Sequence, residues 1–139
     1  MRCYGSSVWA QTQPGSGFPV SQAITVLVVE DEALIRMDIA DQLERMGFAI
    51  LEAANAREAI DIMASHPAVQ VIFTDVDMPG GIDGLELATA VRDRWPPIKI
   101  IVTSGHREVG IADLPNDSRF FAKLYRGSAV ASAIREMLD

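Results

Sequence analysis

The feature that most constrains the fold is an alternation, from residue 24 onward, between short β-branched apolar runs and longer segments with helical periodicity. Five runs have the length and composition of strands, at residues 24–29, 48–52, 69–74, 98–102 and 119–122. The first, third and fourth runs are almost wholly apolar, as is typical of strands that are buried on both faces. This alternation predicts βα units and a parallel sheet.

Four segments carry apolar residues at the spacing of an amphipathic helix. Gly47 suits the C-terminal cap of the first, and Asn55 with Glu58 has the spacing of a capping box at the start of the second. The third follows Gly84 and ends before two prolines, and the last begins near Ser128. The apolar positions that we expect these helices to bury are Ile35, Ile39, Leu43, Met46, Leu87, Ala88, Val91, Val130, Ile134 and Leu138.

Five strands that alternate with helices over residues 24–139 fit one α/β domain, a flavodoxin-like doubly wound parallel sheet of order 2-1-3-4-5 with helices on both faces. Residues 107–118 show little periodicity, so the helix before the fifth strand is predicted to be short or poorly ordered. Residues 1–23 are rich in Gly, Ser, Pro and Gln without periodicity and are predicted to be a disordered leader.

Composition excludes several classes of function. The net charge is −7 and no cluster of Lys and Arg occurs, which argues against a nucleic-acid partner. The single cysteine, Cys3, excludes an internal disulfide framework. No apolar stretch approaches the roughly 20 residues that cross a bilayer, and the N-terminus lacks the features of a secretory signal. We therefore expect a cytoplasmic protein without a membrane partner.

Acidic residues follow two of the predicted strands. Glu30 and Asp31 come directly after the first apolar run, and Asp75 directly after the third. In order 2-1-3-4-5 these two strands are neighbours, so their carboxyl ends share one crevice at the switch point of the sheet. Because three carboxylates in one crevice repel each other, the sequence predicts a bound divalent cation there.

The residues that follow the later strands point to phosphoryl chemistry. Asp75 can act as an oxygen nucleophile and form an aspartyl phosphate. Glu30 and Asp31 can hold Mg²⁺ directly or through water, and a backbone carbonyl near Asp77 can complete the shell. Thr103 and Lys123, at the ends of the fourth and fifth strands, can contact phosphate oxygens through a hydroxyl and an ammonium group, and Ser104 follows Thr103. Each of these residues alone is ordinary at a strand end. The prediction depends on their occurring together, in the order acid pair, aspartate, hydroxyl and lysine.

Over residues 24–139 the chain resembles the receiver domain of bacterial response regulators. The resemblance lies in VLVVEDEALIRMDIADQLERMGF, FTDVDMPGGIDGLEL, IIVTSGH and FFAKLY. It implies that Asp75 accepts a phosphoryl group from a phosphohistidine on a histidine kinase or histidine phosphotransfer protein, in a step that the receiver catalyses itself with Mg²⁺. By the same resemblance Glu30 and Asp31 bind the metal, Thr103 moves toward the phosphate and Lys123 contacts it.

The resemblance further implies that Phe120 turns inward on activation. It indicates a stand-alone receiver, or one excised from a hybrid kinase, that is not an enzyme beyond accepting phosphate and slowly losing it, and that acts through an unknown downstream protein. The family usually has proline after the lysine, where this chain has Leu124, and Asp77 adds an acid at a position that tunes the lifetime of the phosphorylated form.

Two alternatives remain open at the level of sequence. Leu124 favours a phosphorylation-silent binding module that keeps the fold but not the switch. The pair Asp75 and Asp77 also resembles the motif of haloacid-dehalogenase-type phosphatases, which need a further acidic pair after the lysine. Only Glu136 and Asp139 follow Lys123 here, so this enzyme is the weaker alternative.

Overall fold

The structure is a computed structural model, and it describes residues 23–78, 82–105, 114–115, 118–123 and 125–138. A five-stranded parallel sheet has the order β2-β1-β3-β4-β5, which confirms the predicted doubly wound topology. The strands are β1 (Thr25–Val29), β2 (Ala49–Ala53), β3 (Val69–Asp75), β4 (Lys99–Ser104) and β5 (Ser118–Ala122). The predicted strand ends agree with these bounds to within two residues.

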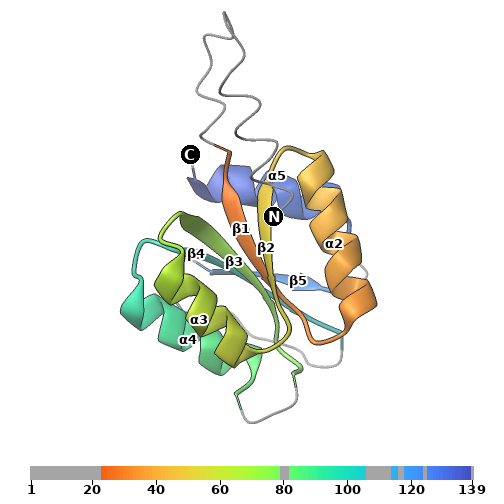
Figure 1. Cartoon of the computed structure of the whole chain (residues 1–139). Helices are drawn as coiled ribbons and strands as arrows, with labels where there is room; N and C mark the ends of the chain where they lie inside the picture. Colours follow the sequence, from red (N-terminus) through yellow and green to blue (C-terminus); the bar gives the residue numbers. More distant parts are fainter. Residues whose placement is uncertain (1–22, 79–81, 106–113, 116–117, 124, 139) are drawn as a thin grey trace, which may run out of the picture.

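Among the described residues, four helices cover the two faces of the sheet, and Figure 1 shows how they are arranged. Helices α3 and α4 lie together on one face, and α2 and α5 lie together on the other. Each face has its own core, with Leu27, Ile72 and Ile100 toward α3 and α4, and Val28, Phe73 and Ile101 toward α2 and α5. The helices are α2 (Ala33–Arg45), α3 (Ala56–Ser65), α4 (Gly84–Arg94) and α5 (Gly127–Leu138).

The helix ends follow from local sequence. Gly47 has a φ of 99°, the left-handed conformation that glycine adopts most readily, and it follows the C-terminal cap of α2. The Asn55 side chain accepts a hydrogen bond from the Glu58 amide, which confirms the predicted cap of α3, while the Glu58 side chain accepts from the Ala54 amide and not from that of Asn55. At α4 the reciprocal capping box is formed by Asp83 and Glu86. This box was not predicted, although the three-residue separation of Asp83 and Glu86 is visible in the sequence.

Two of the sequence predictions lie largely or wholly outside the described residues. The leader prediction concerns residues 1–23, of which only residue 23 is described. The prediction of a short fourth helix concerns residues 107–118, of which 114, 115 and 118 are described. Within the described ranges, no helix has both the length and the apolar character needed to cross a membrane.

Candidate functional site

The predicted site residues meet at the carboxyl end of the sheet. Glu30 follows the last residue of β1, and Asp75 is the last residue of β3. Asp75 pairs with Thr103 in the register of β3 and β4, and Lys123 follows the last residue of β5. Four neighbouring strand ends therefore deliver these side chains to one place, because all the strands run in the same direction.

Three carboxylates form the centre of the site. One oxygen from each of Glu30, Asp31 and Asp75 lies within 4.8 Å of the other two. Glu30 and Asp75 are each only 3% exposed, whereas Asp31 is more accessible to solvent. The Glu32 amide donates a hydrogen bond to Oε2 of Glu30 at 3.1 Å, which holds that carboxylate in place. Glu30 and Asp75 thus form a buried pair, and an ion can reach them from solvent past the more exposed Asp31.

Lys123 reaches into this cluster. Its Nζ lies 2.9 Å from Oε1 of Glu30 and 3.1 Å from Oδ2 of Asp75, so one ammonium group bridges both buried carboxylates. The lysine takes this position although it is followed by Leu124 and not by proline. Leu124 itself lies outside the described residues.

Burial and charge act in opposite directions on the site's protonation. Burial raises the pKa of Asp75 and of Glu30, and the hydrogen bonds from Lys123 offset this only in part. Burial alone lowers the pKa of Lys123, but the bonds to Glu30 and Asp75 outweigh it, so that the pKa of the ammonium group is raised overall. The lysine therefore stays charged at neutral pH. Its single positive charge does not fully compensate the two buried carboxylates, because the pKa of each stays raised.

Hydroxyl groups from β4 complete the site. Thr103 is 1% exposed, and its Oγ1 is a buried atom without a hydrogen-bond partner among the described residues. Ser104 instead donates from Oγ to Oδ2 of Asp77 at 2.7 Å. The amide of Asp77 donates to Oδ1 of Asp75 at 3.3 Å, but its carboxylate is not a member of the cluster of three. Thr103 thus offers an uncommitted donor beside Asp75.

Sequence reasoning did not predict two contacts that support the site. Arg36 of α2 donates from Nη1 to the backbone carbonyl of Glu30 at 2.8 Å, and its Nε lies 3.3 Å from Oε1 of Glu52 in β2. Gly84, at the start of α4, donates its amide to the carbonyl of Val76 at 3.0 Å. Neither contact was predicted, because each depends on how a helix packs against the strand ends beside it, which residue type and spacing do not determine.

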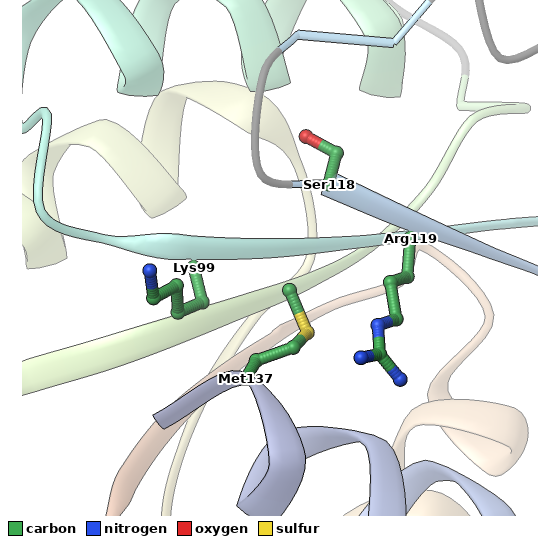
Figure 2. A pocket seen from close by; sticks show the side chains of 4 residues that line it. All are labelled: Lys99, Ser118, Arg119 and Met137. Atoms are coloured by element: carbon green, nitrogen blue, oxygen red, sulfur yellow. The ribbon is translucent and has the colours of Figure 1, made fainter. Parts of the chain in front are cut away.

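Other residues lie away from the cluster. Phe120 is partly buried against the core on the α3 and α4 face. A small hollow of about 180 Å³ lies at the opposite, amino end of β4 and β5, and Figure 2 shows Lys99, Ser118, Arg119 and Met137 around it. Glu136 pairs with Arg119 there at 2.8 Å, so this acid does not belong to the carboxyl-end site.

The donor set fits a hard divalent cation. Three carboxylates and one ammonium group carry a net charge of −3 + 1 = −2, which one divalent ion would neutralise. All the candidate ligand atoms are oxygens, the donors that Mg²⁺ prefers, and the exposure of Asp31 leaves room for the waters that this ion retains. The buried, unpartnered hydroxyl of Thr103 suits a further oxygen-rich group at the same place.

Comparison with known families agrees with this geometry. A model of the response regulator receiver domain matches residues 26–113. The chain therefore belongs to the response regulator receiver domain family, the receiving module of two-component signalling systems.

Individual relatives show how this module is used elsewhere. The chain is 36% identical over 124 residues to the sensor kinase CckA of Brucella abortus, covering 86% of this chain and 13% of the kinase. It is 33% identical over 111 residues to the transcriptional regulatory protein PdtaR of Mycobacterium tuberculosis, covering 78% of this chain and 52% of the regulator. The chain thus spans about half or less of the length of these relatives.

Solved structures show the same fold. The receiver domain of the hybrid histidine kinase CckA superposes with a TM-score of 0.69 at 28% identity, covering 83% of this chain and 99% of that domain. A response regulator receiver protein from Sinorhizobium medicae superposes with a TM-score of 0.77 at 26% identity, covering 84% of this chain and 94% of that protein.

Proposed function

We propose that this receiver domain is a phosphoacceptor switch in a two-component phosphorelay, with Asp75 as the acceptor. The donor is a phosphohistidine on a histidine kinase or histidine phosphotransfer protein. A carboxylate oxygen of Asp75 forms a bond to phosphorus as the phosphorus–nitrogen bond of the donor breaks. The imidazole nitrogen keeps the electron pair and takes up a proton. The observation that carries the proposal is the convergence of two carboxylates, Glu30 and Asp31, and of Lys123 on the buried Asp75.

The other residues have distinct roles in this proposal. Glu30, Asp31 and Asp75 would hold Mg²⁺, with the backbone carbonyl near Asp77 as a further oxygen ligand. When bound, Mg²⁺ supplies positive charge that offsets the charge on the phosphoryl oxygens. Lys123 donates to one phosphoryl oxygen, and it is already held at Asp75 by the ion pair.

Thr103 connects the site to the rest of the domain. Its buried hydroxyl gains an acceptor when a phosphoryl group stands on Asp75, so that the phosphorylated state favours a changed position of β4. Phe120 of β5, which is partly buried beside this region, moves inward in that state. The face formed by β4 and β5 then presents a different surface to a downstream protein.

Two observations bear on the alternatives. The sequence favours a phosphorylation-silent module through Leu124 alone, and the ion pairs of Lys123 with Glu30 and Asp75 support a lysine that is held at the site. A phosphatase of the haloacid-dehalogenase type needs acids after the lysine, and Glu136 is paired with Arg119 at the other end of β5. Both observations support the switch over its alternatives.

Trapping the acyl phosphate tests the proposal at residue level. The protein would be incubated with acetyl phosphate and Mg²⁺, treated with borohydride to reduce the aspartyl phosphate, and digested for peptide sequencing by mass spectrometry. We expect the reduced residue at Asp75, and its loss in Asp31→Asn protein at the same Mg²⁺ concentration. Reduction at another carboxylate would contradict the assignment of Asp75.

A further inference from the structure

Arg36, near the start of α2, contacts the backbone beside the carboxylate cluster. Its Nη1 donates a hydrogen bond to the carbonyl of Glu30 at 2.8 Å, and its Nε lies 3.3 Å from Oε1 of Glu52 in β2. The side chain of Arg36 is 18% exposed and that of Glu52 26%, so both contacts are largely shielded from solvent. Because the guanidinium group is planar and rigid, the contact with Glu52 fixes the direction in which Nη1 points.

The peptide group that Arg36 holds lies between two of the predicted metal ligands. The carbonyl of Glu30 and the amide of Asp31 belong to one planar unit, which includes the Cα atoms of both residues. A hydrogen bond that fixes the carbonyl therefore constrains the two Cα atoms that carry the carboxylate side chains. Asp31 is more accessible to solvent than Glu30, so the place of its carboxylate depends more on this backbone than on packing.

The other polar groups of Glu30 are also engaged. Its amide donates to the carbonyl of Ala53 at 3.1 Å, its Oε2 accepts from the Glu32 amide at 3.1 Å, and its Oε1 lies 2.9 Å from Nζ of Lys123. These three contacts hold the strand end and the carboxylate of Glu30, and none of them involves its carbonyl. Arg36 supplies the constraint on that carbonyl, and so on the step from Glu30 to the next acid.

We propose that Arg36 is a positioning residue that sets the geometry of the acid pair Glu30 and Asp31 and thereby the affinity of the carboxylate cluster for Mg²⁺. This inference rests on the proposed function and deepens it. Arg36 acts through the peptide group that joins the two acids, and Glu52 contributes by orienting the guanidinium group.

Charge and geometry predict opposite effects of Arg36 on metal binding. If charge alone acted, removing the positive charge of Arg36 would raise the affinity for Mg²⁺, and the negative charge of Glu52 would act in the same direction. Loss of the contact with the Glu30 carbonyl instead lowers the affinity, because ligands that are held less firmly must be ordered when the ion binds. The sign of the change therefore distinguishes a positioning residue from a nearby charge.

Titration of Mg²⁺ into the metal-free protein, followed through the amide NMR signals, tests the inference. The same spectra show whether each variant is folded. We expect R36Q to bind Mg²⁺ about tenfold more weakly than wild type, the scale on which loss of a residue that orients metal ligands acts. R36K keeps the charge and a donor but lacks the planar fork, so its affinity should lie between those of wild type and R36Q.

R45Q is the matched control. It removes the same charge from the same helix, but Arg45 belongs to an exposed pair with Asp41. Since this pair makes no contact with the Glu30 carbonyl, R45Q should bind Mg²⁺ as wild type does.

A second readout needs no metal. The Glu32 amide donates to Oε2 of Glu30, and this bond depends on the orientation of the peptide group between Glu30 and Asp31. In R36Q the Glu32 amide should therefore lose part of its protection against exchange with deuterium, and in R45Q it should keep that protection. The amide of Ile72, in the buried strand β3, reports any loss of global stability and serves as the reference.

A folded R36Q protein that binds Mg²⁺ as tightly as wild type, or more tightly, would overturn the inference. Should R36Q not fold, R36K carries the test, and wild-type affinity in R36K would overturn the inference as well. A folded wild-type protein that takes no label from acetyl phosphate with Mg²⁺ would contradict the proposed function instead. Because metal binding and amide exchange are measured without a phosphodonor, the two failures are distinguishable.

Discussion

Gly84 packs directly against the backbone of Asp75. A Cβ atom placed on Gly84 would come within 2.7 Å of the carbonyl carbon of Asp75 and of the Cα of Val76. The amide of Gly84 also donates to the carbonyl of Val76 at 3.0 Å. The N-terminus of α4 is thus pressed against the strand end that carries the predicted acceptor, and only a glycine fits between them.

Replacing this glycine should destabilise the fold. Because backbone atoms cannot move aside as a flexible side chain can, Gly84→Ala is expected to lower the free energy of unfolding by about 1–3 kcal/mol. Chemical denaturation measures the change. Gly105→Ala is a matched control, since the three atoms nearest to its added Cβ would all belong to the Lys123 side chain, the closest at 3.4 Å. Equal stability of the two variants would contradict the close packing.

Removing the lysine from the cluster should destabilise the metal-free protein. Lys123→Met leaves the buried carboxylates of Glu30 and Asp75 without their shared cation. We expect a loss of about 1–3 kcal/mol, less than for a fully buried pair because the lysine side chain is 22% exposed. Denaturation in chelator measures the loss, and Lys99→Met at the far end of the sheet serves as control. Added Mg²⁺ should recover part of the lost stability, and a variant as stable as wild type would argue against the ion pair.

Arg36 should matter more than its place on a helix surface implies. Arg36→Gln removes the donor to the Glu30 carbonyl and the ion pair with Glu52, and we expect a loss of about 1–3 kcal/mol. Arg45→Gln, in the exposed pair with Asp41 on the same helix, should cost less than about 1 kcal/mol. Urea titration of both variants gives the comparison. If the two losses were alike, Arg36 would be an ordinary surface residue.

Alkaline pH should weaken the fold through Tyr125. Burial raises the pKa of Tyr125 to about 12 from its usual value near 10, and its ring packs edge-on against Phe73 at 5.4 Å. Because the folded state holds the phenol proton more tightly than the unfolded state does, this stability is complete below pH 10 and is lost as pH rises toward 12. Lys123 acts in the same direction.

The difference between wild type and Tyr125→Phe isolates this effect. Phenolate absorbance should show one tyrosine fewer in the variant, and the missing titration should have its midpoint near pH 12. The stability of the variant should fall less steeply with pH above 10. A midpoint for Tyr125 at the ordinary value near 10 would contradict its burial.

The sheet and the central residues of the site were predictable because they depend on periodicity. A continuous apolar run identifies a strand with both faces buried, and the residue after it must lie at the carboxyl end. Glu30 and Asp75 follow such runs, and Lys123 follows the fifth predicted strand, so all three were predicted to lie at one edge of the sheet. The parallel register then brought Thr103 opposite Asp75.

The supporting contacts were not predictable for a different reason. Ser104 was noted only as the residue after Thr103, and its hydroxyl donates to Asp77, a choice that depends on side-chain rotamers and not on residue order. Arg36 in α2 donates to the backbone carbonyl of Glu30 in the preceding loop, and the spacing of apolar residues in the sequence does not predict such a contact. The capping box of Asp83 and Glu86 did have a sequence signal, in the three-residue separation of the two acids.

The central claim is that Asp75 accepts a phosphoryl group in a step that needs the carboxylate cluster. Intact-protein mass spectrometry after incubation with acetyl phosphate, with Mg²⁺ or with chelator, tests it most directly, with Asp75→Asn protein in parallel. The account predicts a single phosphoryl adduct on wild type with Mg²⁺, and none with chelator or on the variant. An adduct of equal yield on the variant, or no adduct on folded wild-type protein that binds Mg²⁺, would contradict it.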